Sequence, residues 1–121
     1  MRRVLLIEDN EHLASLTQLM LAELAYECVH VGTVADARAA LAGDSIDLIL
    51  TDYRLPDGNG TDLAPQCGGR PIVVLSGYDA HDLPREKFPA GTIFRTKPLT
   101  FEGLESALQD AVASADRQRN A

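Results

Sequence analysis

The sequence is poor in positive charge and in long apolar runs. Its 121 residues include 11 Lys and Arg against 18 Asp and Glu, so the formal net charge is -7. Binding to the phosphate backbone of nucleic acid needs clustered Lys and Arg, and this balance argues against contact with DNA. No apolar run approaches membrane-spanning length, and the residues after Met1 lead directly into a short strand pattern rather than a signal-peptide core. We therefore expect a cytoplasmic protein that binds neither DNA nor membranes.

Cysteine and histidine are too few and too scattered for a disulfide framework or a zinc site. Cys28 and Cys67 lie far apart and form no Cys-x-x-Cys pair, which is typical of two reduced thiols in the cytosol. His12, His30 and His81 lack the spacing of zinc ligands. A chain of this length fits one domain and can bury a core without such cross-links.

Short apolar runs alternate with amphipathic stretches along the chain. The runs predict five strands, at residues 4–7, 28–31, 46–50, 71–75 and 92–94. Strands that alternate with helices favour an α/β fold with a parallel sheet, right-handed crossovers and helices on both faces. For five strands we expect the flavodoxin-like order 2-1-3-4-5, with a ligand site where strands 1 and 3 diverge.

Helical patterns fill the spaces between these strands. Thr33 followed by Asp36 resembles a capping box, and Thr100 can cap the last helix. The apolar positions at helical spacing are Leu13, Leu16, Met20 and Leu24 in the first helix, Val34, Ala37 and Leu41 in the second, and Phe101, Leu104, Leu108 and Val112 in the last. Residues 114–121 are polar, and we expect them to be a frayed tail.

Polar residues follow four of the predicted strands. Glu8 and Asp9 come after the first strand, Asp52 after the third, Ser76 at the end of the fourth and Lys97 after the fifth. The carboxyl ends of parallel strands open on the same edge of the sheet, so these side chains should converge at the switch point. The sequence therefore predicts one polar site built from distant parts of the chain.

Three carboxylates in one site need a compensating cation. Two carboxylates about 4 Å apart near a protein surface repel by roughly 4 kcal/mol. Lys97 supplies one positive charge, and a divalent ion with oxygen ligands would supply the rest; Mg²⁺ suits a site that keeps waters and receives a phosphate. Glu8 and Asp9 could instead complement the dipole of the first helix, but this explains one acid and leaves the other groups without a reason.

The set of Glu8-Asp9, Asp52, Ser76 and Lys97-Pro98 resembles the signature of the response-regulator receiver domain of two-component signalling. The resemblance covers residues 3 to about 113, and the order and intervals of the motifs make it specific. It implies a single receiver domain over residues 1–121, a signalling domain rather than an enzyme. Such a domain promotes its own phosphorylation and dephosphorylation, receives its phosphoryl group from a histidine kinase or histidine phosphotransferase, and acts on a downstream protein.

The resemblance assigns a role to each motif. Asp52 would be the phosphorylated nucleophile. Asp9, Glu8 and Asp52, with the backbone carbonyl of Arg54, would hold Mg²⁺. Lys97 and the metal would neutralise charge on the phosphoryl group in flight.

Two further features of the family concern the response to phosphorylation. Ser76 would donate its hydroxyl to the phosphoryl group after transfer. Phe94 occupies the position of the aromatic residue that changes its burial on activation, although a core strand residue is the simpler alternative. The bond between Lys97 and Pro98 is often a cis peptide in the family, which an X-Pro bond permits at little cost.

The region between Ser76 and Phe94 departs from the common pattern. Pro84 and Pro89 leave room for only one or two helical turns, so we expect a short or degenerate fourth helix. This stretch is similar to a subgroup of single-domain receivers common in alphaproteobacteria, and to receivers at the end of hybrid kinases. We expect residues 79–90, with Phe94 and the start of the final helix, to form the surface that meets the downstream partner.

Two other function classes remain as alternatives. A pseudo-receiver that only binds proteins usually lacks one of the acids or the lysine, and none is missing here. A phosphatase of the haloacid dehalogenase type also uses an aspartyl nucleophile, but it needs a second acid at position 54, which is arginine. The chain ends soon after the last helix pattern and begins with Met1, which favours a free-standing domain with a protein as output partner, unless the sequence is part of a longer protein.

Overall fold

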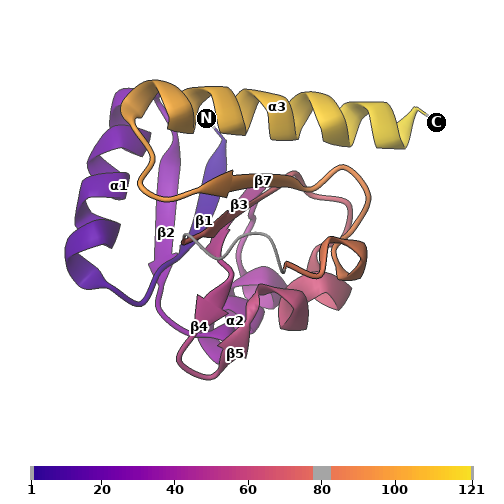
Figure 1. Ribbon diagram of the computed structural model, residues 1–121, viewed down its shortest axis with the longest axis horizontal. Coiled ribbons are helices and arrows are strands. Elements are labelled where there is room, and N and C mark those ends of the chain that lie inside the picture. The colour runs from indigo at the N-terminus through magenta and orange to yellow at the C-terminus, as the bar shows by residue number, and fades with distance from the viewer. Residues whose placement is uncertain (1, 78–82, 121) are drawn as a thin grey trace.

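The computed structural model describes residues 2–77 and 83–120 and has an α/β fold built on one parallel sheet (Figure 1). The sheet order is β2-β1-β3-β6-β7, which confirms the predicted flavodoxin-like order 2-1-3-4-5. The strands are β1 Arg3–Ile7, β2 Glu27–Val31, β3 Leu48–Asp52, β6 Ile72–Ser76 and β7 Ile93–Thr96. Because all neighbouring pairs are parallel, the carboxyl ends of the five strands share one edge.

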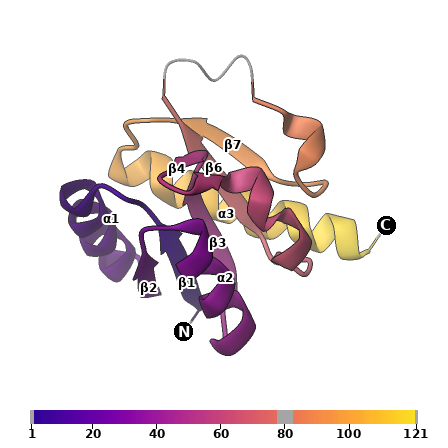
Figure 2. The same cartoon turned by 90° about the horizontal axis from the view of Figure 1, so that it is seen from below.

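Helices cover both faces of the sheet. Within residues 2–77 and 83–120, the α-helices are α1 Glu11–Glu23, α2 Val34–Gly43 and α3 Phe101–Arg119, and the 3-10 helices are η1 Gly60–Gln66 and η3 Arg85–Lys87. Figure 2 shows α2 on the near side of the sheet and α3 on the far side. A small hairpin, β4 Arg54–Leu55 and β5 Gly58–Asn59, follows β3.

Successive side chains along a strand point alternately into two hydrophobic cores, one on each face of the sheet. Leu5 and Ile7 of β1 pack in the core that α2 and η1 cover, whereas Val4 and Leu6 pack in the core under α1 and α3. The residues of β3 and β6 are all buried. Burial on both faces explains why the strands read as continuous apolar runs in the sequence.

Side-chain caps begin the three α-helices. The side chain of Thr33 accepts from the N–H of Asp36 at the start of α2, and that of Thr100 accepts from Gly103 at the start of α3, as the sequence predicts. Asn10 caps α1 by accepting from the N–H of Leu13. Each cap satisfies an N–H that the first turn of a helix leaves without a partner.

The prediction of a frayed tail from residue 114 is wrong for residues 114–119, because α3 continues to Arg119. Ser114 and Ala115 are buried. A Cβ added to Gly91 would lie 2.8 Å from Ser114 Oγ, so the loop before β7 rests directly on this part of the helix. The segment is mostly polar, so nothing in its sequence indicated that Ser114 and Ala115 are packed against the rest of the protein.

The apolar faces of two helices also differ from the prediction. Leu13 and Leu16 of α1 are exposed, and the buried residues of that helix are Ala14 and Leu21. Phe101, at the start of α3, is 37% exposed. The helices face the sheet with both alanines and leucines, among them Ala14, Leu21 and Leu104, while Leu13, Leu16 and Phe101 lie at the edges of the buried faces.

The region between β6 and β7 contains one short helical element in its described part, the three-residue η3. This agrees with the prediction of a short or degenerate fourth helix. Residues 79–82 of the predicted partner surface lie outside the described residues. In the part of the chain that the structure describes, no helix has the combined length and apolar character needed to cross a bilayer.

Candidate functional site

Two acids follow β1 at the carboxyl edge of the sheet. Glu8 is 5% exposed, while Asp9 is exposed to solvent. One carboxylate oxygen of Glu8 accepts from the N–H of Asn10 at 3.1 Å, so Glu8 does contribute to the start of α1. Its other oxygen lies 3.0 Å from the Nζ of Lys97, so the contact with the helix alone does not account for the residue.

Asp52 ends β3 and shares a cation with Glu8. The Nζ of Lys97 lies 2.6 Å from Asp52 Oδ1 and 3.0 Å from Glu8 Oε1. Asp52 is 5% exposed, and the side chain of Lys97 is 30% exposed. Residues separated by more than forty positions thus meet at one point, as the strand ends predict.

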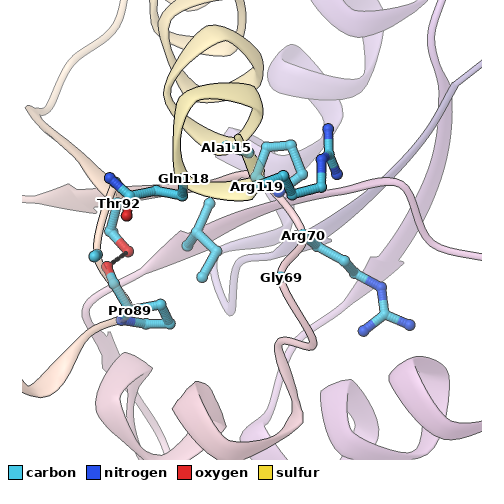
Figure 3. A pocket seen from close by; sticks show the side chains of 11 residues that line it. Gly69, Arg70, Pro89, Thr92, Ala115, Gln118 and Arg119 are labelled. Atoms are coloured by element: carbon cyan, nitrogen blue, oxygen red, sulfur yellow. Dashed lines mark hydrogen bonds between the residues drawn. The ribbon is translucent and has the colours of Figure 1, made fainter. Parts of the chain in front are cut away.

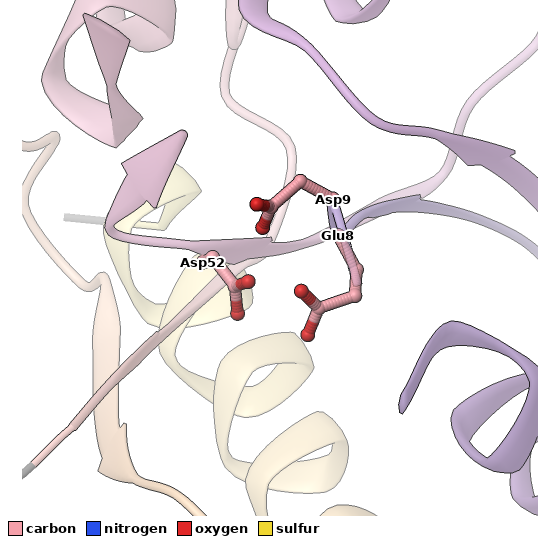
Figure 4. A group of neighbouring side chains, drawn as sticks. All are labelled: Glu8, Asp9 and Asp52. Carbon is pink, nitrogen blue, oxygen red and sulfur yellow. The ribbon is translucent and has the colours of Figure 1, made fainter. Parts of the chain in front are cut away.

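Glu8, Asp9 and Asp52 form a cluster that could hold a metal ion. One carboxylate oxygen from each residue lies within 4.8 Å of the others. Figure 4 shows the three side chains directed toward a common space from the ends of β1 and β3. Oxygen ligands of this kind suit Mg²⁺, which is bound through one or two carboxylates with waters and a phosphate.

The acid pair has strongly shifted pKa values. Burial, and then the proximity of Glu8, raises the pKa of Asp52 to about 8, although Lys97 acts in the opposite direction. Burial alone would raise the pKa of Glu8 as well, but hydrogen bonds from Asp52, Asn10 and Lys97 lower it below its ordinary value. The two carboxyl groups therefore hold one proton between them near neutral pH.

The pKa of Lys97 is raised by the same contacts. Burial would lower the pKa of its ammonium, but its contacts with Asp52 and Glu8 outweigh burial and raise the pKa. Lys97 is therefore charged at neutral pH, and its single positive charge faces two carboxylates with Asp9 nearby. The site favours binding of a further cation.

Ser76 ends β6 beside these residues. It is 8% exposed, and among the described residues its Oγ is the one buried side-chain polar atom without a hydrogen-bond partner. The carbonyl of Ser76 accepts from the N–H of Lys97 at 2.7 Å, so the two residues are held together. A buried hydroxyl without a partner is costly, and a ligand oxygen at this edge would satisfy it.

Phe94 lies on β7 in a small aromatic cluster. Its ring is 5.4 Å from that of Phe88 in an edge-to-face arrangement, and Arg85 lies 4.6 Å above its centroid. Phe88 also approaches Tyr53, at 6.4 Å, and Tyr53 directly follows Asp52. The half-buried Phe94 is thus linked to the acidic site through two aromatic rings.

The remaining predicted residues lie close to the acids. Arg54, two residues after Asp52, forms β4 and pairs with Asn59 of β5. The peptide bond between Lys97 and Pro98 is cis. These positions are consistent with the site that the sequence predicts, and the three carboxylates with Lys97 form its centre.

Two polar residues that the sequence analysis did not single out bond to backbone atoms of distant elements. His30 Nε2 lies 2.8 Å from the backbone oxygen of Glu8. Asp57 bonds to the first turn of α2. Asp57 lies between β4 and β5 in the chain, and only the fold brings it to the helix.

A largely apolar cavity of about 180 Å³ opens beside the acids. It lies between α1 and the loop that follows β7, and it is lined by Glu8, Leu13, Leu16, Thr17, Met20, Leu75, Lys97, Pro98, Leu99 and Leu104. Since Glu8 and Lys97 both bond within the acidic site, the cavity leads directly to it. The exposed leucines of α1 form one of its walls.

A second cavity, of about 220 Å³, lies at the opposite end of the sheet, between the loops before β6 and β7 and the end of α3 (Figure 3). No carboxylate lines it. The guanidinium of Arg70, one of its neighbours, donates to the backbone oxygens of Ile46, Gln66 and Cys67 and so ties loops together. Arg70 therefore has a structural role at this end of the sheet.

Comparison with known proteins places the chain among response regulators. The family model of the response regulator receiver domain matches residues 4–109. The response regulator protein PilR of Pseudomonas aeruginosa is 32% identical over 98% of this chain, and the regulatory protein LuxO of Vibrio cholerae is 29% identical over 95%. The chain spans 27% and 26% of these two relatives, about a quarter of their length.

A solved structure points the same way. The receiver domain of a sensor histidine kinase from Pseudomonas aeruginosa PAO1 has a TM-score of 0.79 and 25% identity, and the match covers 93% of this chain and 98% of that one. That structure has a magnesium ion coordinated in its active-site cleft.

Fold and site together define a signalling domain with an acidic phosphoacceptor centre. The chain belongs to the response regulator receiver domain family. Its cluster of Glu8, Asp9 and Asp52 matches the phosphoacceptor and magnesium site of that family, and the acids and the lysine are all in place, which gives no support to a pseudo-receiver.

Proposed function

We propose that Asp52 accepts a phosphoryl group from the phosphohistidine of a histidine kinase or histidine phosphotransferase. The observation that carries this proposal is the position of Asp52: it is buried at the carboxyl edge of the sheet, bonded to Lys97 at 2.6 Å and beside two further acids. We place the reaction in the cytoplasm, where the free thiols of Cys28 and Cys67 fit a reducing compartment.

In the transfer step, a carboxylate oxygen of Asp52 attacks phosphorus. The bond from phosphorus to the imidazole nitrogen of the donor breaks, and its electron pair remains on the imidazole. The ammonium of Lys97, already within hydrogen-bond distance of Asp52, would follow the charge onto the phosphoryl oxygens. Catalysis of this kind depends on position and on electrostatic stabilisation.

The donor set fits Mg²⁺. Asp9, Glu8 and Asp52 would hold the ion, with the backbone carbonyl of Arg54, because one carboxylate oxygen from each acid lies within 4.8 Å of the others. When bound, Mg²⁺ neutralises charge on the phosphoryl group. Asp52 must be ionised to act as the nucleophile, so the proton has to leave as the site is loaded.

After transfer, the hydroxyl of Ser76 would donate to a phosphoryl oxygen. This would satisfy its buried Oγ and draw the end of β6 toward Asp52. Because the carbonyl of Ser76 is bonded to Lys97, β7 and Phe94 would respond to the same movement. We propose that Phe94, Arg85 and the start of α3 belong to the surface that presents the signal to a downstream protein.

The phosphodonor would approach along α1. The apolar cavity between α1 and Pro98 shares Glu8 and Lys97 with the site, and Leu13 and Leu16 are exposed along it. A helix of the kinase or phosphotransferase that carries the histidine could bury these leucines and reach Asp52. Burial of exposed apolar side chains next to the reaction centre would contribute affinity.

Phosphorylation by a small donor tests the proposal. Incubation with acetyl phosphate or a phosphoramidate should increase the intact mass by one phosphoryl group in the presence of Mg²⁺ and leave it unchanged in EDTA. The variant Asp52→Asn should remain unlabelled under both conditions. Equal labelling of the wild type and this variant would contradict the assignment of Asp52.

A further inference from the structure

Asp57 joins the hairpin that follows Asp52 to the first turn of α2. Its Oδ1 accepts from the N–H of Val34 at 2.7 Å, and its Oδ2 accepts from the N–H of Ala35 at 3.0 Å. Thr33 accepts from the next N–H, that of Asp36. The first three N–H groups of α2 are therefore satisfied, two of them by a residue more than twenty positions away.

The hairpin itself is anchored at the acidic site. The N–H of Tyr53 donates to the carbonyl of Leu75 at 2.8 Å, and the carbonyl of Tyr53 accepts from Gly60 at 2.7 Å. Between this base and the tip at Asp57 lies Arg54, paired with Asn59. The backbone of Arg54 is thus held between one contact near Asp52 and a second contact on α2.

The start of α2 is in turn tied to the other acids. The N–H of Glu8 donates to the carbonyl of Val31 at 3.0 Å. A Cβ added to Gly32 would lie 3.7 Å from the carbonyl oxygen of Glu8 and 3.8 Å from Cα of Asp9. The loop that leads into α2 is therefore packed against the backbone of the Glu8-Asp9 pair.

The hairpin is seated closely on α2. A Cβ added to Gly58 would overlap the carboxylate of Asp62 and would lie 3.4 Å from a methyl group of Val34. A side chain at position 58 would displace the Asp62 carboxylate, which accepts from the N–H of Asn59 in the hairpin, and would touch Val34 of α2. Gly58 therefore keeps the hairpin tip in place independently of the charge of Asp57.

We propose that Asp57 is a positioning residue for the metal site. By fastening the hairpin to α2, it sets the distance between the backbone of Arg54, which follows Asp52, and the Glu8-Asp9 pair. Asp57 does not itself touch the ion. The inference rests on the proposed function, since Mg²⁺ is the ligand whose site Asp57 aligns.

The charge of Asp57 suits this role. Its hydrogen bonds from Val34 and Ala35 lower its pKa, so the side chain is ionised at neutral pH and both oxygens accept. An amide at this position has one acceptor and one donor, so Asp57→Asn retains the shape but loses one of the two bonds. The helix N-terminus also favours the negative charge.

Calorimetric titration of the full chain with Mg²⁺ alone tests the proposal. Asp57→Asn should weaken Mg²⁺ binding about tenfold, as is common when a residue that orients metal ligands is altered. Asp36→Asn is the matched control: it removes the same charge from the first turn of α2, and within the described chain its carboxylate has no hydrogen bond to the hairpin. Its Mg²⁺ affinity should stay within about twofold, because an exposed charge is screened.

Gly58→Ala provides a second variant that leaves the charge unchanged. It should also weaken Mg²⁺ binding, and it carries the test if Asp57→Asn does not fold. A role confined to stability would lower the melting temperature of both variants while their Mg²⁺ affinity stayed at the wild-type level, and that result would overturn the inference alone. A wild-type protein that does not bind Mg²⁺ would overturn the proposed function, and the inference with it.

Discussion

Lys97 is bonded to two buried carboxylates at once, and this contact sets the properties of the site. Its Nζ is 2.6 Å from Asp52 and 3.0 Å from Glu8. Burial, and then the proximity of Glu8, raises the pKa of Asp52 to about 8 in spite of Lys97, so the pair retains a proton near neutral pH. Before a metal binds, the site is therefore held in a state that is unfavourable for nucleophilic attack.

The shifted pKa of Asp52 predicts how stability depends on pH without Mg²⁺. The pKa is about 8 in the folded protein and has its ordinary value of 3.8 in the unfolded chain. Between these values the folded state keeps a proton that the unfolded state has released. The free energy of unfolding in EDTA should therefore fall as pH rises through this range, by up to about 1.4 kcal/mol per pH unit, and become constant above it.

Denaturant titrations at several pH values in EDTA measure this dependence. Asp52→Asn removes the titrating group, so the slope should decrease, and at pH 8 this variant should be more stable than the wild type by about 1 kcal/mol or more. A wild-type stability that does not change between pH 5 and pH 8 would contradict the raised pKa.

Asp9 should be required for stabilisation by Mg²⁺. A ligand that binds only the folded state adds about 2.7 kcal/mol at one hundred times its dissociation constant. Thermal melting with and without Mg²⁺ should show a shift in the wild type and none in Asp9→Ala. Glu11→Ala, at an exposed acid just outside the cluster, is the control and should keep the wild-type response. An unchanged response in Asp9→Ala would exclude Asp9 as a ligand.

At the scale of single residues, the sequence predicts those that directly follow strands. Glu8, Asp52 and Lys97 converge because parallel strands end on one edge, which is a property of the topology. Asp57 and His30 could not be found in this way. Their contacts are with backbone atoms of distant elements, and no side-chain pattern in the sequence records such contacts.

At the scale of elements, strands were easier to predict than helix faces. A strand buried on both sides is a continuous apolar run, whereas the buried face of α1 depends on how closely the helix approaches the sheet. Ala14 and Leu21 make that contact, and Leu13 and Leu16 remain exposed beside the site. The end of α3 was missed because Ser114 is buried by the loop that contains Gly91, a tertiary contact.

Phe88 anchors the segment between β6 and β7 to the core. It is buried in the core under α2 and η1 and touches both Tyr53 and Phe94. Phe88→Ala should lower the free energy of unfolding by about 3–5 kcal/mol, as is usual for a buried phenylalanine.

The matched control is Phe101→Ala, since Phe101 is 37% exposed and lies on α3. Its loss should cost less than about 1 kcal/mol. Chemical denaturation of both variants gives the comparison. Similar losses at the two positions would contradict the anchoring role of Phe88.

At the scale of the whole molecule, the sheet lies between two hydrophobic cores, and its carboxyl edge brings the residues of the site together. The residues of the proposed phosphoacceptor site end or directly follow β1, β3, β6 and β7, so we expect a change at Asp52 to reach both sides of the sheet. The apolar cavity along α1 lies on one side of the site, and the cluster of Phe88, Phe94 and Arg85 on the other. Under the proposed function, the phosphodonor would enter on one side of the site and the signal would leave on the other.

Hydrogen exchange with and without beryllofluoride, a phosphoryl mimic, should reveal the output side. We expect the main changes in protection within residues 83–96 and at the start of α3, because Ser76 and Lys97 bracket this part of the chain and would both bind the mimic. A short 3-10 helix provides few internal hydrogen bonds, so this segment should respond readily. Changes confined to α1, β2 and α2 would mean that the signal leaves by another route.

The position of the phosphoryl group tests the central claim most directly. After labelling with a small phosphodonor and Mg²⁺, proteolysis and tandem mass spectrometry of the full-length chain identify the modified residue. The modification should lie on Asp52, in the peptide that follows β3, and should be absent when Mg²⁺ is removed. A phosphoryl group on Glu8, Asp9 or any other residue, with Asp52 unmodified, would contradict the account.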